Sequence, residues 1–224
     1  IHTAGMAHDL KNSKSLNDYL ESNFELTKQL YSAFLKSNAK KFLFFSSVKA
    51  VADSIENKLD LTKVPNPKTH YGISKRKAEE FIIKQNNKNK FFYILRPCMI
   101  HGDGNKGNLN LLFNIIDAGI PWILGAFKNS RSFLSIDNLN FIVRELLISD
   151  IRSGLYFLSD SSPISTNSIV RRIGASVSKR IIILKIPKII VKFFAIIGDF
   201  LKLPINSERL KKLTESYVVD NSNI

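Results

Sequence analysis

Cysteine, acidic side chains and uncharged apolar runs are all scarce in this sequence of 224 residues. Cys98 is the one cysteine, so the chain has no internal disulfide, which fits a reducing compartment. No signal peptide or transit segment is visible. Together these absences predict a cytoplasmic protein, and the hydrophobic share of 44% is enough for a sizeable core.

The most apolar segment, residues 181–203, contains four lysines and an aspartate. No uncharged run in it reaches the ~18–20 residues that a membrane-spanning helix needs. Its large apolar residues recur at helical spacing from Ile189 to Leu201, with the charged residues on the opposite side. We therefore expect no membrane span, and we expect an amphipathic helix that covers a core rather than one that lies on a membrane.

Basic residues outnumber acidic ones by 33 to 19, which gives a net charge of +14. Such a charge can indicate nucleic-acid binding. The lysines are scattered rather than gathered on one stripe, however, and no nucleic-acid-binding motif is recognisable. We therefore expect no nucleic-acid partner, and we attribute most of the charge to solvated surface, with a local share for a phosphate-bearing substrate.

In the N-terminal half, short apolar segments alternate with longer segments of helical period. The wholly apolar run from Phe42 to Phe45 has the length and aromatic content of a strand buried on both faces. The alternation predicts a parallel α/β sheet, whose ligands bind at the carboxyl ends of the strands. Residues 1–5 are expected to be the tail of a buried strand that runs into a turn, and the other expected strands are 42–45, 91–95 and 154–158. The expected helices are 16–37, 74–85, 109–118, 139–148, 166–177 and 189–201. Residues 49–68 are expected to be mainly loop and 101–108 a glycine-rich loop.

Tyr71 and Lys75 are four residues apart, so on a helix they share one face. An ammonium beside a phenol favours the phenolate and lowers its pKa from about 10, which suits the phenol to general acid–base chemistry. Six tyrosines in a lysine-rich chain could produce this spacing by chance. Gly5, Ser47 and Pro97 all lie at predicted strand ends, so they converge on the same crevice and favour the functional interpretation.

Seven motifs occur in register along the chain. They are His2-Thr3-Ala4-Gly5, Asn23, Ser46-Ser47, Tyr71-Gly72-Ile73-Ser74-Lys75, Leu95-Arg96-Pro97, Gly107-Asn108, and Arg131-Ser132-Phe133 with Ile136-Asp137-Asn138-Leu139. Their order and spacing resemble the extended short-chain dehydrogenase/reductase family, and within it the NAD-dependent epimerase/dehydratase group that acts on nucleotide sugars. The resemblance covers nearly the whole chain.

The resemblance implies a Rossmann-like, doubly wound parallel sheet with a smaller α/β substrate-binding region in the C-terminal part. Residues 1–97 would belong to the dinucleotide-binding domain. Residues 98–224 would be mainly substrate-binding, with some elements returning to the Rossmann sheet. The implied cofactor is NAD, with NADP as an open alternative, and no metal is implied.

The resemblance also assigns roles to individual residues. Tyr71 would be the catalytic acid–base, Lys75 would hold the ribose hydroxyls of the cofactor, and Ser47 would hydrogen-bond the reacting sugar oxygen. Asn108 and Arg131 would grip the diphosphate of the substrate. The remaining cofactor contacts would come from Thr3, Ala4, Gly5, Asn23, Ser46 and Pro97, together with Tyr71 and Lys75.

One family feature is missing, because no Gly-x-x-Gly-x-x-Gly fingerprint for the dinucleotide occurs in the sequence. Two strand–helix steps, or roughly 60 residues, precede the family position that matches Ile1. There is also no initiator methionine. We therefore expect the sequence to be a fragment of a longer protein, and we expect these 224 residues alone to bind NAD poorly.

The leading functional hypothesis is a nucleotide-sugar epimerase that acts at C4 of a UDP-hexose or UDP-N-acetylhexosamine through a keto intermediate, in surface polysaccharide synthesis. A 4-keto-sugar reductase that uses NAD(P)H is the nearest alternative. A non-catalytic protein that binds NAD or a nucleotide sugar is an alternative of another class. By the same resemblance, a homodimer would form through the helices near residues 16–37 and 74–85.

Overall fold

The computed structural model describes residues 1–7, 14–85, 89–102, 108–201 and 206–222, without the side chains of Asn108 and Leu111. These residues form two compact units. Unit 1 comprises Ile1–Ile100, Leu134–Ser161 and Val219–Ile224, and unit 2 comprises His101–Phe133 and Ser162–Val218. Most of the expected glycine-rich loop at 101–108 lies outside the described residues.

A parallel three-stranded sheet forms the centre of unit 1. Its order is β1 (Lys41–Phe45), β3 (Phe91–Pro97) and β6 (Gly154–Leu158), and Leu43 pairs with Tyr93 in register. His2 forms a further parallel bridge to Phe44 on the other side of β1. The sheet confirms the predicted α/β fold, since the apolar run of β1 is buried as expected.

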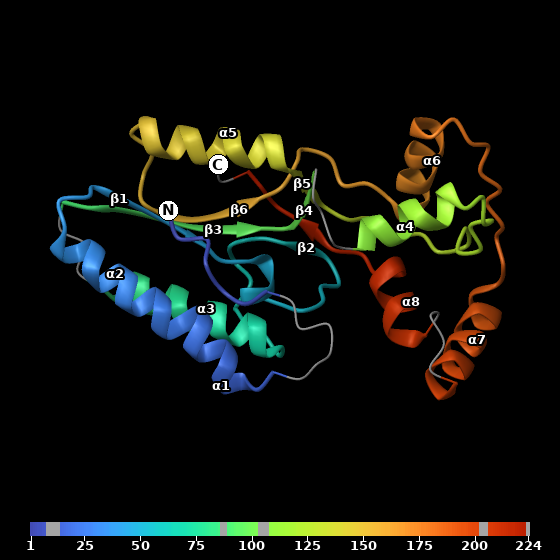
Figure 1. The fold of residues 1–224 in the computed structure, drawn as a ribbon, viewed down its shortest axis with the longest axis horizontal. Coiled ribbons are helices and arrows are strands. Elements are labelled where there is room, and N and C mark those ends of the chain that lie inside the picture. Colours follow the sequence, from blue (N-terminus) through green and yellow to red (C-terminus); the bar gives the residue numbers. More distant parts are fainter. Residues whose placement is uncertain (8–13, 86–88, 103–107, 202–205, 223–224) are drawn as a thin grey trace. The chain divides into compact units, whose positions relative to one another are not determined.

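Helices cover both faces of this sheet, with α5 (Ile136–Ile148) on one face and α2 (Leu26–Lys36) and α3 (His70–Lys84) on the other (Figure 1). Before α2, the chain forms α1 (Leu16–Tyr19) and a π-helical turn, η1 (Leu20–Glu25). Side-chain caps fix the helix starts, because Ser15, Thr69 and Ser135 each accept a backbone N–H three residues ahead. Beneath α2 and α3 lies an aromatic and aliphatic core of Tyr31, Phe34, Phe42, Phe44, Ala78, Ile82 and Ile94.

Short elements interrupt the segment that the sequence suggested was mainly loop. A 3₁₀ turn, η2 (Val48–Ala50), follows β1 directly. Farther along, β2 (Lys58–Leu59) pairs with β7 (Val218–Val219). A second short pair joins β4 (Met99–His101) to β5 (Phe133–Ser135). Strands of two or three residues carry too little periodic pattern for the sequence to reveal them.

Unit 2 is built from helices around one apolar cluster. Its helices are α4 (Asn108–Asp117), α6 (Thr166–Ser176), α7 (Lys188–Phe200) and α8 (Ser207–Thr214). Trp122 lies in the cluster, and its Nε1 donates to Asn167 Oδ1 at 2.7 Å. The buried members of the cluster are Leu112, Ile116, Trp122, Leu124, Phe127, Val170, Val191, Ala195 and Leu210.

The expectation that α7 covers a core with its large apolar residues was wrong. The residues that α7 buries are Val191, Ala195 and Gly198, a stripe of small side chains at helical spacing. Ile189 and Phe193, from the face that we expected to be buried, are 77% and 60% exposed. Among the residues that the structure describes, no helix is long and apolar enough to cross a membrane.

Candidate functional site

The start of α3 places Tyr71 in the first turn of a helix that begins earlier than the sequence predicted. Thr69 caps the helix by accepting the N–H of Gly72. Asp53 holds Thr69 in turn, because its carboxylate accepts the Thr69 hydroxyl at 2.8 Å and the backbone N–H groups of Lys68 and Thr69. The helix start is therefore fixed by the loop that follows β1, and Tyr71 and Lys75 share one helix face as predicted.

Tyr71 interacts with Ser47, which follows the end of β1. A side-chain hydrogen bond from Ser47 favours the phenolate and by itself lowers the pKa of Tyr71. Burial acts in the opposite direction and more strongly, so the pKa of Tyr71 lies above its ordinary value. The prediction that Lys75 lowers this pKa was therefore wrong, since the groups that act on the phenol are its buried surroundings, Ser47 and Tyr19.

Lys75 directs its ammonium to the carboxyl end of β1. Its Nζ donates to the Phe45 carbonyl oxygen at 2.8 Å and lies 4.9 Å from the centre of the Phe44 ring. The residue is buried, and burial lowers the pKa of its ammonium to about 8, against an opposing effect of Glu79. A buried ammonium with one carbonyl partner retains two N–H donors for a ligand.

The strand end at Thr3, Ala4 and Gly5 is exposed and lies next to this ammonium. Gly5 has a φ of +150°, and a Cβ placed there would lie 3.4 Å from Lys75 Nζ and 2.5 Å from Asn23 Oδ1. Only glycine fits this backbone and this space. An open backbone beside a buried ammonium fits the ribose of a dinucleotide, which agrees with the cofactor that the sequence suggests.

Asn23 ties this strand end to α3. Its Oδ1 accepts the N–H of Met6 at 2.8 Å, and its Nδ2 donates to the Met6 carbonyl at 3.0 Å and to Ser74 Oγ at 2.9 Å. Asn23 is fully buried, and it lies on the π turn η1. Turns of this kind are frequent at functional sites. Asn23 therefore braces this strand end against α3, while its predicted contact with a cofactor stays a prediction.

A buried ion pair lies behind the site, and the sequence analysis missed it. Arg96 donates from Nε and Nη2 to the two carboxylate oxygens of Glu79, at 2.8 and 2.6 Å. Ser46 Oγ donates to the same carboxylate at 2.6 Å. The Ser46 hydroxyl is therefore engaged in the interior, which weakens its predicted role in cofactor binding. The sequence does place Glu79 one helical turn after Lys75, so on the same face of α3, and this spacing was the signal that could have pointed to Glu79.

The other predicted residues lie in different parts of the fold. Pro97 is buried at the carboxyl end of β3, in unit 1. Asn108 begins α4 in unit 2, and its side chain lies outside the described part. Arg131, also in unit 2, donates from Nη1 to the Lys212 carbonyl and lies 3.9 Å from Glu215. The diphosphate contacts that the resemblance assigns to Asn108 and Arg131 remain predictions.

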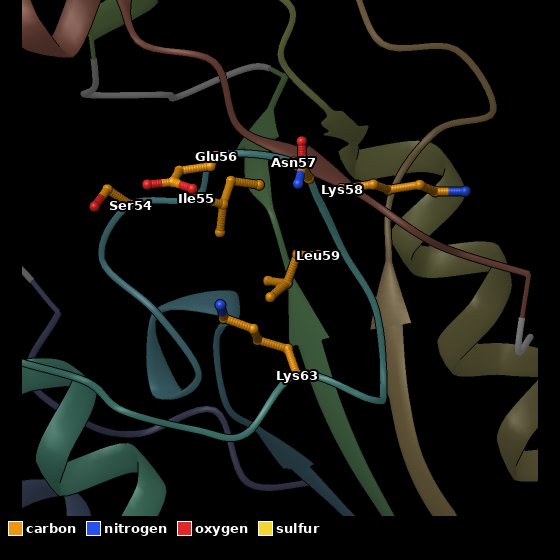
Figure 2. A pocket seen from close by; sticks show the side chains of 7 residues that line it. All are labelled: Ser54, Ile55, Glu56, Asn57, Lys58, Leu59 and Lys63. Atoms are coloured by element: carbon orange, nitrogen blue, oxygen red, sulfur yellow. The ribbon is translucent and has the colours of Figure 1, made fainter.

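A hollow of 340 Å³ opens elsewhere in unit 1, on the segment between η2 and α3 (Figure 2). Leu59 and Lys63 face it, while Lys58 extends away and pairs with Asp220 at 3.0 Å. None of the predicted site residues lines it. In the described ranges, no group of three His, Cys, Asp or Glu side chains could hold a metal ion. The chemistry-bearing residues therefore gather at the strand ends and not in this hollow.

Gly5→Ala should destabilise the full-length protein by about 2–4 kcal/mol, because it adds a clash with Asn23 to the strain of a positive φ. Gly119→Ala is the matched control. Gly119 also has a positive φ, of +71°, but a Cβ there would meet nothing within 4 Å, so it should cost only about 1–2 kcal/mol. Urea unfolding measures both. Equal costs would show that the Asn23 contact does not constrain Gly5.

Two kinds of comparison relate this chain to known proteins. Residues 1–144 match the model of the NAD dependent epimerase/dehydratase family. A UDP-glucose 4-epimerase from Vibrio cholerae is 29% identical over 230 residues, which cover 100% of this chain and 68% of that protein. An N-acetyl-α-D-glucosaminyl-diphospho-ditrans,octacis-undecaprenol 4-epimerase from Escherichia coli O157:H7 is 27% identical, over 92% of this chain and 65% of that protein.

Solved structures share the fold. The Bordetella bronchiseptica enzyme WbmG, in complex with NAD and UDP, has a TM-score of 0.72 at 18% identity, over 99% of this chain and 63% of WbmG. A UDP-N-acetylglucosamine 4-epimerase from Bacillus cereus has a TM-score of 0.72 at 20% identity, over 96% of this chain and 69% of that protein. The chain thus spans about two thirds of the length of these relatives.

Proposed function

Because the chain belongs to the NAD dependent epimerase/dehydratase family, we propose that it is part of an NAD-dependent epimerase that inverts C4 of a UDP-hexose or UDP-N-acetylhexosamine. The observation that carries the proposal is the arrangement at the carboxyl end of β1. There Ser47 interacts with the Tyr71 phenol, and the buried Lys75 ammonium lies beside the open strand end at Gly5. The names of the relatives from Vibrio cholerae and Bacillus cereus support the 4-epimerase assignment.

The residues that would hold the cofactor are Thr3, Ala4 and Gly5, with Lys75 on the ribose and Pro97 near the ring. NAD, when bound, supplies hydride transfer at the sugar carbon, so that a 4-keto sugar lies between the two epimers. Lys75 retains N–H donors beyond the one that contacts Phe45, and these suit paired ribose hydroxyls. Asn23 keeps the strand end next to α3, so that backbone and ammonium face one ligand.

Tyr71 would move the proton of the 4-hydroxyl. Its raised pKa means that the phenol is neutral near pH 7 and that its phenolate, once formed, is a strong base. The hydrogen bond from Ser47 stabilises that phenolate, and Ser47 would also hydrogen-bond the reacting sugar oxygen. In its phenolate form, which Ser47 stabilises, Tyr71 would accept the proton of the 4-hydroxyl, and the resulting phenol would return it to the ketone oxygen when the hydride returns.

Asn108 and Arg131 would bind the diphosphate of the substrate. A guanidinium is permanently charged and can present a fork of donors to phosphate oxygens. Arg131 is held by the Lys212 carbonyl in unit 2, which limits the orientations of its side chain.

Product analysis of the full-length protein tests the proposal. UDP-glucose or UDP-N-acetylglucosamine, incubated with catalytic NAD, should give an equilibrium mixture of the two C4 epimers with no net change in cofactor. Consumption of NAD(P)H in proportion to product from a 4-keto sugar would favour the reductase alternative instead. Binding of a UDP-sugar without turnover of any of these substrates would favour the non-catalytic alternative.

A lipid-linked sugar is a second candidate substrate, favoured by the relative from Escherichia coli O157:H7. By its name, that enzyme epimerises C4 of a sugar joined through a diphosphate to undecaprenol. The same proton and hydride chemistry would serve both substrates, because they differ only beyond the diphosphate. Undecaprenyl-diphosphate-N-acetylglucosamine should therefore be included in the assay, and a role in surface polysaccharide synthesis fits either substrate.

A further inference from the structure

The outward face of α7 is apolar along its whole length. The helix packs on unit 2 through Val191, Ala195 and Gly198, which are all buried. The opposite stripe, at spacings of four, three and four residues, consists of Ile189, Phe193, Ile196 and Phe200, which are 60% to 92% exposed. A helix on the surface of a globular protein normally carries polar residues on the side that faces water. In α7 the large apolar side chains therefore face outward, and the small ones face the core.

Exposed apolar side chains are concentrated around this helix. Nine of the 21 large apolar residues that are exposed in the described part of the chain lie between Ile182 and Leu201. Scattered single residues of this kind are normal on a protein surface, whereas a contiguous patch marks an interaction site. The patch consists of the stripe of α7 together with Ile190, Phe194 and Leu201, and Ile182 and Leu184 are also exposed in the segment before the helix.

Basic side chains flank the patch. Lys188 and Lys192 are exposed and lie one turn apart on one side of α7, and Lys185 is exposed just before the helix. Asp199 is the one acidic residue between Ile182 and Leu201, and its carboxylate already accepts the N–H of Ser207. An apolar face with lysines at its edge is complementary to a lipid bilayer with anionic headgroups, which is apolar inside and negatively charged at its surface.

We propose that α7 docks this protein on an anionic membrane surface. The 13 residues of α7 are about 20 Å long, too short to cross a bilayer but suited to lying in the plane of the interface. Phe193, Phe200 and their neighbours enter the boundary between headgroups and acyl chains, while Lys188 and Lys192 contact anionic headgroups. The docking surface is independent of the proposed catalytic residues, because it uses none of them.

Vesicle flotation of the full-length protein tests the proposal. The wild type should bind vesicles of phosphatidylcholine with 30% phosphatidylglycerol about tenfold more tightly than vesicles of phosphatidylcholine alone, and 0.5 M salt should reduce the difference. Phe193→Ser combined with Phe200→Ser should weaken binding to the anionic vesicles at least about tenfold. Lys192→Gln should weaken it about fivefold.

Phe141→Ser is the matched control. Phe141 lies on α5 and is 62% exposed, similar to Phe193, but it lies outside the patch, so its loss should leave vesicle binding within about twofold. Circular dichroism melting verifies that each variant is folded. Equal binding by the wild type and the Phe193/Phe200 variant would overturn the proposal. So would a wild type that is dimeric without lipid and becomes monomeric in that variant, because a second copy would then cover the face.

Discussion

Tyr71→Phe in the full-length protein should lower kcat for epimerisation about 10³-fold while changing the affinity for UDP-sugar less than about threefold. The phenol hydroxyl is the group that would carry the proton between the sugar oxygen and the protein, and general acid–base catalysis typically contributes ~10²–10⁴-fold. Phenylalanine keeps the ring and its packing, so the loss should fall on the chemical step. Steady-state kinetics with both epimers, together with calorimetric titration of UDP-sugar, separates the two effects.

Tyr93→Phe provides the control for this experiment. Tyr93 is fully buried on β3 and donates its hydroxyl to the Ile151 carbonyl at 2.9 Å, so the substitution also removes one buried phenol hydroxyl. It should cost about 1 kcal/mol of stability and leave kcat within about twofold. If Tyr71→Phe kept more than a tenth of wild-type turnover, the assignment of Tyr71 as the acid–base would be wrong.

Breaking the pair between Glu79 and Arg96 should produce the largest loss of stability. Both side chains are almost fully buried, and Glu79→Gln leaves the Arg96 guanidinium without its carboxylate partner, at a cost of about 3–5 kcal/mol. Glu79→Gln should show this loss in urea unfolding of the full-length protein, whereas Arg96→Met should cost less, because the Glu79 carboxylate keeps an ion pair with Arg76 at 3.4 Å. The double variant Glu79→Met with Arg96→Met should cost less than the sum of the single variants, because it removes both charges.

The exposed pair of Glu25 and Lys28 is the control for this loss. Their contact distance of 3.2 Å resembles that of a buried pair, but both side chains are more than 40% exposed. Glu25→Gln should therefore cost less than about 1 kcal/mol. Equal costs for Glu25→Gln and Glu79→Gln would show that burial does not determine the strength of the Glu79–Arg96 pair.

Glu79→Gln should also change the pH dependence of activity. Glu79 acts to raise the pKa of Lys75, which burial has lowered to about 8. Without that carboxylate the pKa of Lys75 should fall further below its ordinary value, so a smaller fraction of Lys75 is charged near neutral pH. The alkaline limb of kcat/KM should then move to lower pH, whereas a purely structural loss would leave the profile in place.

Local patterns in the sequence were enough to predict the sheet. The apolar run of β1 and the helical period of residues 16–37 each reflect burial of one element, so each is readable from a short window. The spacing of Tyr71 and Lys75 likewise fixed their shared helix face. Their order with the strand ends at Gly5, Ser47 and Pro97 was sufficient to suggest the site.

The remaining features depend on contacts between distant parts of the chain. Glu79 and Arg96 are 17 residues apart, and no local rule pairs them. The pKa of Tyr71 depends on how deeply the fold buries the phenol. In α7, apolar residues lie on almost every side, so periodicity located the charged flank but could not show that the fold buries the small residues around Ala195 instead of Phe193.

The wide turn η1 reconciles two demands on a single helix. Buried residues follow one another at steps of four from Tyr19 through Asn23 and Thr27 to Tyr31, and in a regular α-helix each such step drifts about 40° around the axis. At η1 the N–H of Leu26 bonds to the carbonyl of Glu21, five residues back, which absorbs part of this drift. The same side of the helix can therefore hydrogen-bond Met6 and Ser74 through the Asn23 amide at one end. At the other end it packs the Tyr31 ring into the hydrophobic core. The π turn thus keeps Asn23, which braces the candidate site, and Tyr31, which packs in the core, on the same side of one helix, and deleting one residue from the turn would place them on different sides.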